Sequence, residues 1–459
     1  MKILAAKKQD QIWDWTLFFS ILLYLILPTV YRSYSIFLIG NKLPTANGLA
    51  IVSQWQFIQV SLEILQEAFV LPMFFFIGSK IKNSKNEIAQ RIKTSFSILI
   101  LFILPVVVII YLNIDSFVQI IGTADAIKLS TESFLKIKIW SVLFNILSIG
   151  IIITVESLNK KRLLLSLTIL KLLLSIAIDS LFYGGYSFSL AFGINGVAIS
   201  NLIVDSCIFV VAFFSVLRAI GIDVRTFFKL PTFKEVKLFS IISFGSGVES
   251  LVKNVAYLFM IIKLLNLIGP QQIGGYYLTM HIFWSFALIP ILALSETSKA
   301  LIANYSSQKE SIKRILKTAI FISLIVIAIW LVTTLFIGEV FSFFNNDSDI
   351  LNFAQKSYLL LLPAYILLAL NMIIDSLFYG VGKTKYMALQ AIYTNGTVYL
   401  GAYVLYVLKL WIPSFHSVMI LFGIGIVVDS FLTVLYAKRV FKEIDLANTS
   451  HNSVFTASR

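Results

Sequence analysis

The sequence predicts an all-α integral membrane protein with twelve transmembrane helices in two six-helix lobes, related by a pseudo-two-fold axis along the membrane normal. Three observations lead to this prediction: the apolar composition, the length of the hydrophobic runs, and a similarity between the two halves of the chain. Of the 459 residues, 58% are hydrophobic and only 13% are charged. A soluble core of this size could not bury so much apolar side chain.

The hydrophobic runs are long enough to cross a bilayer. They recur about twelve times over roughly 20 residues or more, which at about 1.5 Å per helical residue spans a hydrocarbon core about 30 Å thick. Continuous runs of this length favour helices, because a barrel strand would alternate polar and apolar residues over short segments. The expected spans are 13–40, 50–77, 94–118, 133–157, 163–184, 193–218, 237–267, 273–302, 315–338, 355–381, 386–408 and 415–437.

The last six spans repeat features of the first six. Lys93-Thr94 matches Lys317-Thr318, and Asp125 matches Asp349, at a constant separation of 224 residues. An internal repeat of this kind is typical of secondary transporters, with the binding site between the halves. We expect an N-terminal lobe over 1–220, a C-terminal lobe over 221–442 and a flexible polar cytoplasmic tail over 443–459.

The net charge of +14 indicates membrane topology and not a nucleic-acid partner. The basic residues gather in every second loop, around 80–93, 160–162, 218–237, 309–317, 383–385 and 438–442. By the positive-inside rule these loops and both termini are cytoplasmic. Together with abundant Ile, Phe, Lys and Asn, this pattern predicts a multi-pass protein of a bacterial plasma (inner) membrane.

Several classes of site are disfavoured by the residue types present. Cys207 is the only cysteine, which excludes an intrachain disulfide and a CxxC-type metal site. Lys7 and Lys8 precede an apolar run too long for the core of a cleavable signal, so we expect this run to remain as the first helix. With three histidines and neither an HExxH nor a GxSxG motif, the chain is not expected to be an enzyme.

Motifs at the ends of several spans resemble a known family. The run GVGKTK at 380–385 resembles the G-x-G-[DK]-T turn after the tenth helix of the multidrug and toxic compound extrusion (MATE) family. Asp179, followed by GINGVAI at 193–199, is similar to the family's fifth-helix acid and the opening of its sixth helix. The resemblance implies two six-helix lobes, export, and proton or sodium antiport with organic, often cationic, substrates.

Departures from the family pattern leave the coupling ion open. Many members carry an aspartate in the first helix, where this chain has Ser35, and an asparagine in the fifth helix, where it has Ser175. The acid that some members have in the tenth helix is missing near Leu368, while Asp375 lies about two turns further on. The coupling ion could therefore be H⁺ or Na⁺, and Na⁺ could bind at Asp179 or Glu249; no other cofactor is expected.

Ionisable residues inside the spans are functional candidates, because a charge in hydrocarbon is costly unless it faces a cavity or a partner. The cation-coupling candidates are Glu63, Glu67, Asp179, Asp205 and Glu249. The substrate-cavity candidates are Arg32, Gln59, Lys253, Asn254, Trp55, Tyr277, Trp284 and Asp375, the aromatic ones because their rings could contact a cationic or planar substrate.

Two spacings give these candidates a more specific arrangement. In the second span, Gln59, Glu63 and Gln66 recur every three or four residues and form a polar stripe on one helix face, where Glu63 could pair with Arg32. In the seventh span, Glu249 and Lys253 are four residues apart and can pair on one face. That pair has only a structural role unless a substrate or a proton competes with Lys253 for Glu249. For Asp375, pairing with Lys383 near the cytoplasmic interface is the simpler interpretation.

The leading functional prediction is a secondary active exporter that moves small organic, cationic or amphipathic compounds out of the cell by alternating access, driven by a proton or sodium gradient. We expect this antiporter to be a monomer in the lipid bilayer. The alternative is a lipid-linked saccharide flippase of the same superfamily, which would need cations in a lobe cavity; Arg32, Lys136, Lys138, Lys253, Lys263 and Lys299 keep it open. The heptapeptide at 178–184 recurs at 374–380, but in non-equivalent spans, and we interpret this identity as chance.

Overall fold

The computed structural model describes residues 12–41, 51–52, 54–81, 84–121, 123, 125–221, 224, 231–344 and 348–456. All regular secondary structure in this part of the chain is helical, which confirms the all-α prediction. Contacts divide the chain into two compact units: an N-terminal unit, Phe19–Ile241, and a C-terminal unit, Ile242–Arg459 together with Met1–Phe18. The division falls within a helix, some twenty residues after the lobe boundary expected at 220.

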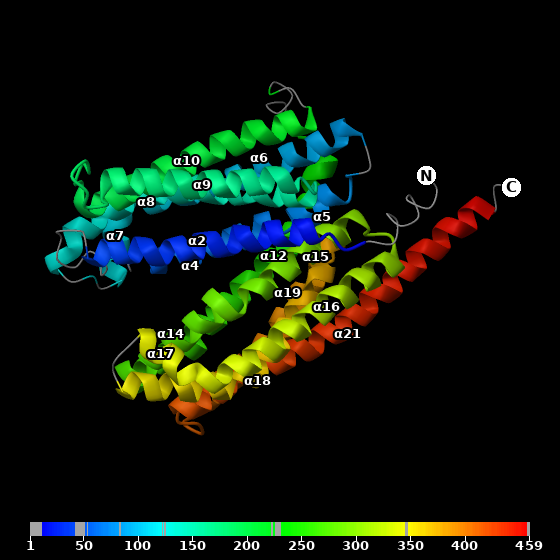
Figure 1. Ribbon diagram of the computed structural model, residues 1–459. Coiled ribbons are helices and arrows are strands. Elements are labelled where there is room, and N and C mark those ends of the chain that lie inside the picture. Colours follow the sequence, from blue (N-terminus) through cyan, green and yellow to red (C-terminus); the bar gives the residue numbers. More distant parts are fainter. Residues whose placement is uncertain are drawn as a thin grey trace. The chain divides into compact units, whose positions relative to one another are not determined.

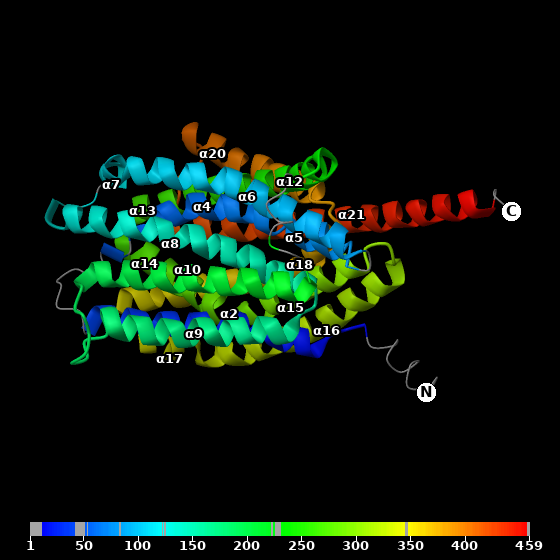
Figure 2. The ribbon, with the colours of Figure 1, turned by 90° about the horizontal axis from the view of Figure 1, so that it is seen from above.

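The helices of the N-terminal unit run roughly parallel to one another in two perpendicular views (Figures 1 and 2). Among them α8 is central, because it packs against α10, α6, α5 and α9. The helices are α2 (Trp15–Asn41), α4 (Trp55–Val70), α5 (Met73–Gly78), α6 (Lys85–Leu112), α7 (Ile114–Ile121), α8 (Asp125–Ser157), α9 (Lys161–Phe182) and α10 (Gly193–Ile220).

The C-terminal unit repeats this pairing around α18. That helix packs against α21, α15, α14 and α16, just as α8 packs against α10, α5 and α6. The helices are α12 (Phe233–Tyr257), α13 (Lys263–Ile268), α14 (Pro270–Ile282), α15 (Ile289–Asn304), α16 (Lys309–Thr333), α17 (Ile337–Phe344), α18 (Ser348–Gly380), α19 (Lys385–Thr394), α20 (Leu400–Val407) and α21 (Phe415–Thr456). Short π or 3₁₀ segments join some of them: η1 (Leu258–Ile262), η2 (Phe283–Ala287), η3 (Thr334–Phe336) and η4 (Asn395–Tyr399).

Each predicted span corresponds to one helix or to an interrupted run of helices. Among the described residues, eight helices are long and apolar enough to cross a membrane alone, and a ninth span results if the α14–α15 pair, bent by 51°, is counted as one. The predicted span 50–77 is broken between α4 and α5 at Pro72. The spans 237–267, 273–302 and 386–408 each contain a π segment. Hydropathy does not detect such breaks, because the apolar run continues through them.

The region 443–456 belongs to α21, where the sequence predicted a flexible tail. Figures 1 and 2 show α21 continuing past the other helices of its unit toward the C-terminus. Two acidic residues of α21 form ion pairs with lysines of neighbouring segments: Glu443 with Lys383 at 2.9 Å, and Asp445 with Lys309. These interactions favour continued helix at the start of the predicted tail.

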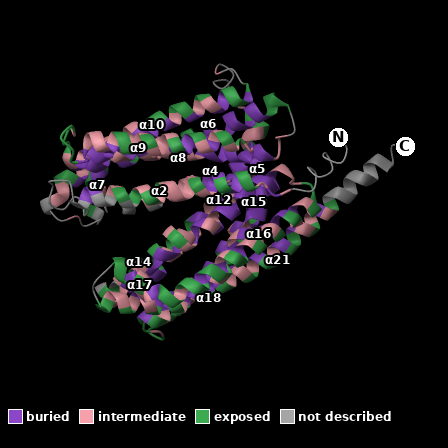
Figure 3. Ribbon diagram, viewed as in Figure 1, coloured by how far each residue is buried: buried purple, intermediate pink, exposed green. Residues whose placement is uncertain are grey.

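Burial differs between central and peripheral helices (Figure 3). Most of α15 is buried, whereas only four residues of α9 are. Large apolar side chains such as Leu101 and Phe321 are about two-thirds exposed. Exposure of this kind is expected of helices whose outer faces contact lipid.

Candidate functional site

The N-terminal unit contains a cavity of about 710 Å³ between α2, α4, α8, α9 and α10. It brings together six of the candidate cation-coupling and substrate-cavity residues, from four different spans. These residues are Arg32, Trp55, Gln59, Glu63, Asp179 and Asp205. The cavity lies within this one unit, and its volume is that of a site for a drug-sized molecule.

Asp179 lies on α9 in the cavity wall and is only 6% exposed. Its carboxylate accepts hydrogen bonds from three hydroxyl groups: Tyr31 on α2, Ser200 on α10, and Tyr183, which donates at 2.5 Å. Ser35 and Tyr183 share a further hydroxyl contact of 2.9 Å. A buried carboxylate is costly unless it accepts such bonds, so these donors hold Asp179 at a junction of three helices.

Asp205 on α10 is a second buried carboxylate of the same cavity. It accepts hydrogen bonds from Ser141 at 2.8 Å and Asn145 at 3.1 Å, both on α8. It also forms an ion pair with Lys171 on α9 at 3.1 Å. The sequence analysis did not single out Lys171. Its spacing was a usable signal, because Lys171, Ser175 and Asp179 follow one another every four residues and share one face of α9.

The polar stripe of the second span, Gln59, Glu63 and Gln66, lines the cavity. Gln59 and Glu63 face it, and the Gln59 amide donates to Glu63 at 2.7 Å. Glu67 is exposed and does not line this cavity, and the Gln56 side chain lies outside the described residues. The predicted Arg32–Glu63 ion pair is wrong for the described side chains, since Glu63 bonds Gln59 and the exposed Arg32 has no carboxylate at ion-pair distance.

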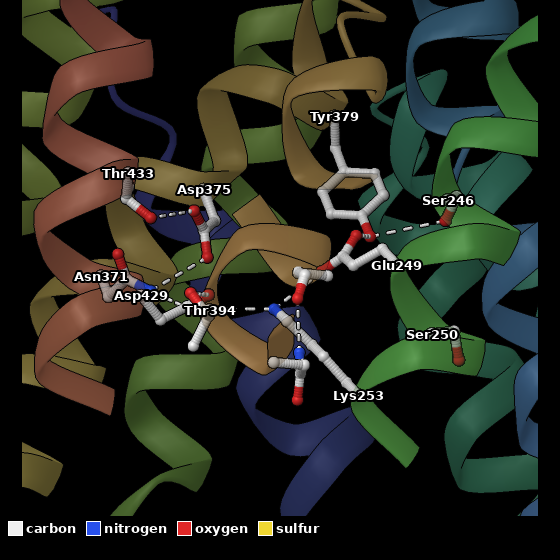
Figure 4. Close-up of polar contacts among 12 residues, drawn as sticks. Ser246, Glu249, Ser250, Lys253, Asn371, Asp375, Tyr379, Thr394, Asp429 and Thr433 are labelled. Atoms are coloured by element: carbon white, nitrogen blue, oxygen red, sulfur yellow. Dashed lines mark hydrogen bonds and ion pairs between the residues drawn. The ribbon is translucent and has the colours of Figure 1, made fainter. Parts of the chain in front are cut away.

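The C-terminal unit contains a separate buried polar cluster around Lys253 (Figure 4). The predicted i,i+4 pair is present, with the Lys253 ammonium 3.0 Å from Glu249. The same ammonium lies 3.9 Å from Asp429 on α21. Asp375 on α18 belongs to the same cluster, because the Asn371 amide donates to both Asp429 and Asp375. Three carboxylates from three helices therefore lie in one cluster with a single ammonium.

Neutral donors complete the cluster, as the dashed lines in Figure 4 show. The Asn371 amide donates to Asp429 at 3.0 Å and to Asp375 at 3.3 Å, and the Tyr379 hydroxyl donates to Glu249 at 2.6 Å. Thr433 donates to Asp375 at 3.1 Å. The simpler interpretation of Asp375, a pair with Lys383, is wrong, because Lys383 pairs with Glu443.

The remaining candidates of the C-terminal unit make local contacts or are partly exposed. The Asn254 amide donates to the Ser250 carbonyl one turn earlier at 2.9 Å, which is a local helix contact. Tyr277 and Trp284 are about half exposed.

The two predicted sodium positions differ in the groups that bond the carboxylate. The Asp179 oxygens accept hydrogen bonds only from hydroxyl groups, whereas one oxygen of Glu249 accepts a hydrogen bond from the Lys253 ammonium. Among the described residues, no group of three or more His, Cys, Asp or Glu side chains has the geometry to hold a metal ion. A protein cation thus occupies the place beside Glu249 where a free cation would bind.

Comparison with known proteins finds a family similarity. The family model MatE matches residues 246–404, about a third of the chain. This segment is therefore similar to members of the MATE family. The multidrug export protein MepA of Staphylococcus saprophyticus is 23% identical to this protein over 321 residues, which cover 68% of the chain and 69% of MepA. The predicted family resemblance is thereby confirmed.

Solved structures extend the similarity over both units of the chain. The MATE transporter VcmN of Vibrio cholerae, in its bent form, is similar with a TM-score of 0.79 and 16% identity, over 94% of this chain and 96% of VcmN. A transporter of the MOP superfamily from Pyrococcus furiosus, described as having a binding pocket of reverse polarity, gives a TM-score of 0.78 at 14% identity, over 94% of this chain and 95% of that one. The predicted fold class is confirmed by these similarities.

Proposed function

We propose that this protein acts as a MATE-type, proton-coupled exporter of amphipathic organic compounds, cationic ones included. It works by alternating access as a monomer in a bacterial plasma membrane, with both termini on the cytoplasmic side. The N-terminal cavity holds the substrate, and Asp179 holds the coupling proton. MepA is a multidrug export protein, which supports organic compounds of more than one kind as substrates.

The observation that carries this proposal is the set of three hydroxyl groups around Asp179. An ionised carboxylate only accepts hydrogen bonds, whereas a protonated one has a hydrogen to donate and less capacity to accept. Protonation therefore forces at least one of the donors Tyr31, Tyr183 and Ser200 to release its bond or turn its hydroxyl. Because these donors come from α2, α9 and α10, the proton changes how three walls of the cavity are joined.

Helix α2 is the wall that responds most easily. Pro28 lies within it, three residues before Tyr31, and a proline removes one backbone hydrogen bond and weakens the helix at that turn. Tyr24, Leu27 and Tyr31 of α2 all line the cavity. If release of Tyr31 moves this wall, protonated and ionised Asp179 give cavities of different shape, and a substrate that prefers one of them is coupled to the proton.

The cluster around Lys253 supports placing the coupling ion in the N-terminal unit. There the protein supplies its own cation to Glu249 and Asp429, so a proton or Na⁺ must compete with a tethered ammonium. At Asp179 the partners are neutral hydroxyl groups, and taking up or releasing a proton does not break an ion pair.

The test is transport in proteoliposomes with proton and sodium gradients imposed separately. We expect efflux of a fluorescent organic cation such as ethidium to follow the proton gradient, and Asp179→Asn to abolish this response while the protein still binds ethidium. Tyr31→Phe removes one donor and should slow driven efflux by about tenfold, equivalent to ~1.4 kcal/mol. The matched control is Asp115→Asn, at an exposed carboxylate of α7.

Two results would contradict the proposal. One is driven efflux that is the same in Asp179→Asn and Asp115→Asn. The other is efflux that follows only the sodium gradient, which would assign the coupling to Na⁺ and not to a proton.

A further inference from the structure

The charged groups that line the N-terminal cavity differ in how many hydrogen-bond and ion-pair partners the protein gives them. Formally they balance, with three cations and three carboxylates: Arg32, Lys138, Lys171, Glu63, Asp179 and Asp205. Each carboxylate accepts from protein donors: three hydroxyl groups for Asp179, two neutral groups and Lys171 for Asp205, and an amide for Glu63. The unused hydrogen-bonding capacity of the cavity must therefore be sought among its cations.

Lys138 is the cation with the least protein compensation inside the cavity. It lies on α8, and the contact recorded for its ammonium is the Trp55 ring, whose centroid is 6.0 Å away, at the far limit for a cation–π interaction. Among the described side chains, neither Lys138 nor Arg32 has a carboxylate within ion-pair distance.

Both of these cations face the same cavity. An ammonium has three donors and a guanidinium has five, and both bind carboxylate, sulfonate or phosphate oxygens strongly. Trp55, which is 8% exposed, provides an apolar wall beside Lys138. A ligand with an acidic group and an aromatic or aliphatic body would satisfy both features.

We propose that Lys138 and Arg32 form an anion-binding subsite of the N-terminal cavity, and that the transported compounds include amphiphiles with an acidic group, placed with the acid at these cations and the apolar body against Trp55. This inference rests on the proposed function in one respect, that the cavity is the substrate site. It deepens that function by naming a substrate class. The acidic group does not occupy the place of the coupling proton, because the proton acts through the donors of Asp179.

The test is equilibrium binding of two fluorescent probes to the full-length protein in nanodiscs of phosphatidylcholine. Anilinonaphthalene sulfonate carries the acidic group, and phenylnaphthylamine has the same ring system without it. We expect Lys138→Met to weaken sulfonate binding about tenfold, equivalent to ~1.4 kcal/mol, and to leave binding of the neutral probe unchanged. Lys138→Arg keeps the charge and should bind the sulfonate nearly as well as the wild type does.

Lys136→Met is the matched control, because Lys136 is on the same helix but pairs with Asp115 at 3.5 Å and does not line the cavity. The proposal is overturned if Lys136→Met and Lys138→Met weaken the sulfonate equally, since the effect is then general electrostatic attraction. It is also overturned if Lys138→Met weakens both probes equally or neither. Retained binding of the neutral probe shows that the variant is folded.

Two further arms separate related questions. Replacing part of the phosphatidylcholine with phosphatidylglycerol shows whether an anionic lipid headgroup competes for the subsite. Competition that Lys138→Met abolishes assigns the natural acidic group to a lipid, and no competition assigns it to a soluble compound; both results retain the subsite. The binding assay imposes no ion gradient, so a failure of proton coupling and a failure of this subsite give different results.

Discussion

Removal of the Lys253 ammonium should destabilise the C-terminal unit more than loss of any surface charge. In Lys253→Met the side chain keeps its length and apolar stem, but Glu249 loses a 3.0 Å partner and Asp429 loses a 3.9 Å one. Asp375 then lies in a cluster of three carboxylates without a cation. We expect the loss to appear as lower thermal stability.

The magnitude follows from burial. Removing one partner of a buried ion pair costs about 3–5 kcal/mol, because the other charge is left uncompensated. The side chains of Glu249 and Asp429 are 9% and 12% exposed, but that of Lys253 is 37% exposed, so solvent already screens part of the interaction. We therefore expect a cost of about 2 kcal/mol and a fall of roughly 4–8 °C in the thermal midpoint.

The assay is the fraction of protein that stays monodisperse on size exclusion after heating in detergent. The matched control is Lys313→Met, which removes a lysine from an exposed pair with Glu310 and should leave the midpoint unchanged. Asp429→Asn combined with Lys253→Met should cost less than the sum of the two single variants, since the double variant leaves fewer uncompensated charges. Equal midpoints for Lys253→Met and Lys313→Met would refute this account of the cluster.

Two further predictions concern packing and a buried cation. Gly275→Ala should destabilise the protein by about 1–3 kcal/mol, because its new Cβ would lie 2.5 Å from the Cβ of Phe353. Gly274→Ala should be tolerated, because the atom nearest to its new Cβ would be 3.4 Å away. Equal thermal midpoints for the two variants would contradict this reasoning. Arg91→Met should destabilise the protein by about 2–4 kcal/mol. Arg91 is 6% exposed, and the Phe76 carbonyl, the Ser79 hydroxyl and the Glu235 carboxylate would all lose their bond to its guanidinium. Lys80→Met, at an exposed ion pair, should have no measurable effect in the same assay.

The sequence predicted half of the polar cluster of the C-terminal unit because that half is local. Glu249 and Lys253 lie one turn apart on the same helix, and their pairing needs no knowledge of the fold. Asp429 joins them from α21, 176 residues after Lys253, and nothing local distinguishes it from other acids near mid-span. Its role depends on how α12 and α21 pack, which is a property of the tertiary structure.

The repeated heptapeptide illustrates the same limit. Segments 178–184 and 374–380 have identical sequences in non-equivalent spans, and the structure gives them different partners. In the first, the Tyr183 hydroxyl donates to Asp179 within the same segment. In the second, the corresponding Tyr379 donates to Glu249 on another helix, although Asp375 is equally close in sequence. Identical local sequence thus led to different hydrogen bonds because the surrounding helices differ.

The sequence by itself determined that this protein is helical, spans a membrane many times and is built as two related halves. These properties follow from hydrophobicity and its length scale, which are local and additive along the chain. Only the tertiary structure decided which buried polar groups meet. Tyr31 reaches Asp179 across 148 residues, and Asp205 takes Lys171 while Lys138 is left without a carboxylate. Such pairings are set by the packing of separate helices, since a hydrogen bond needs atoms within about 3 Å and the sequence does not fix distances between helices.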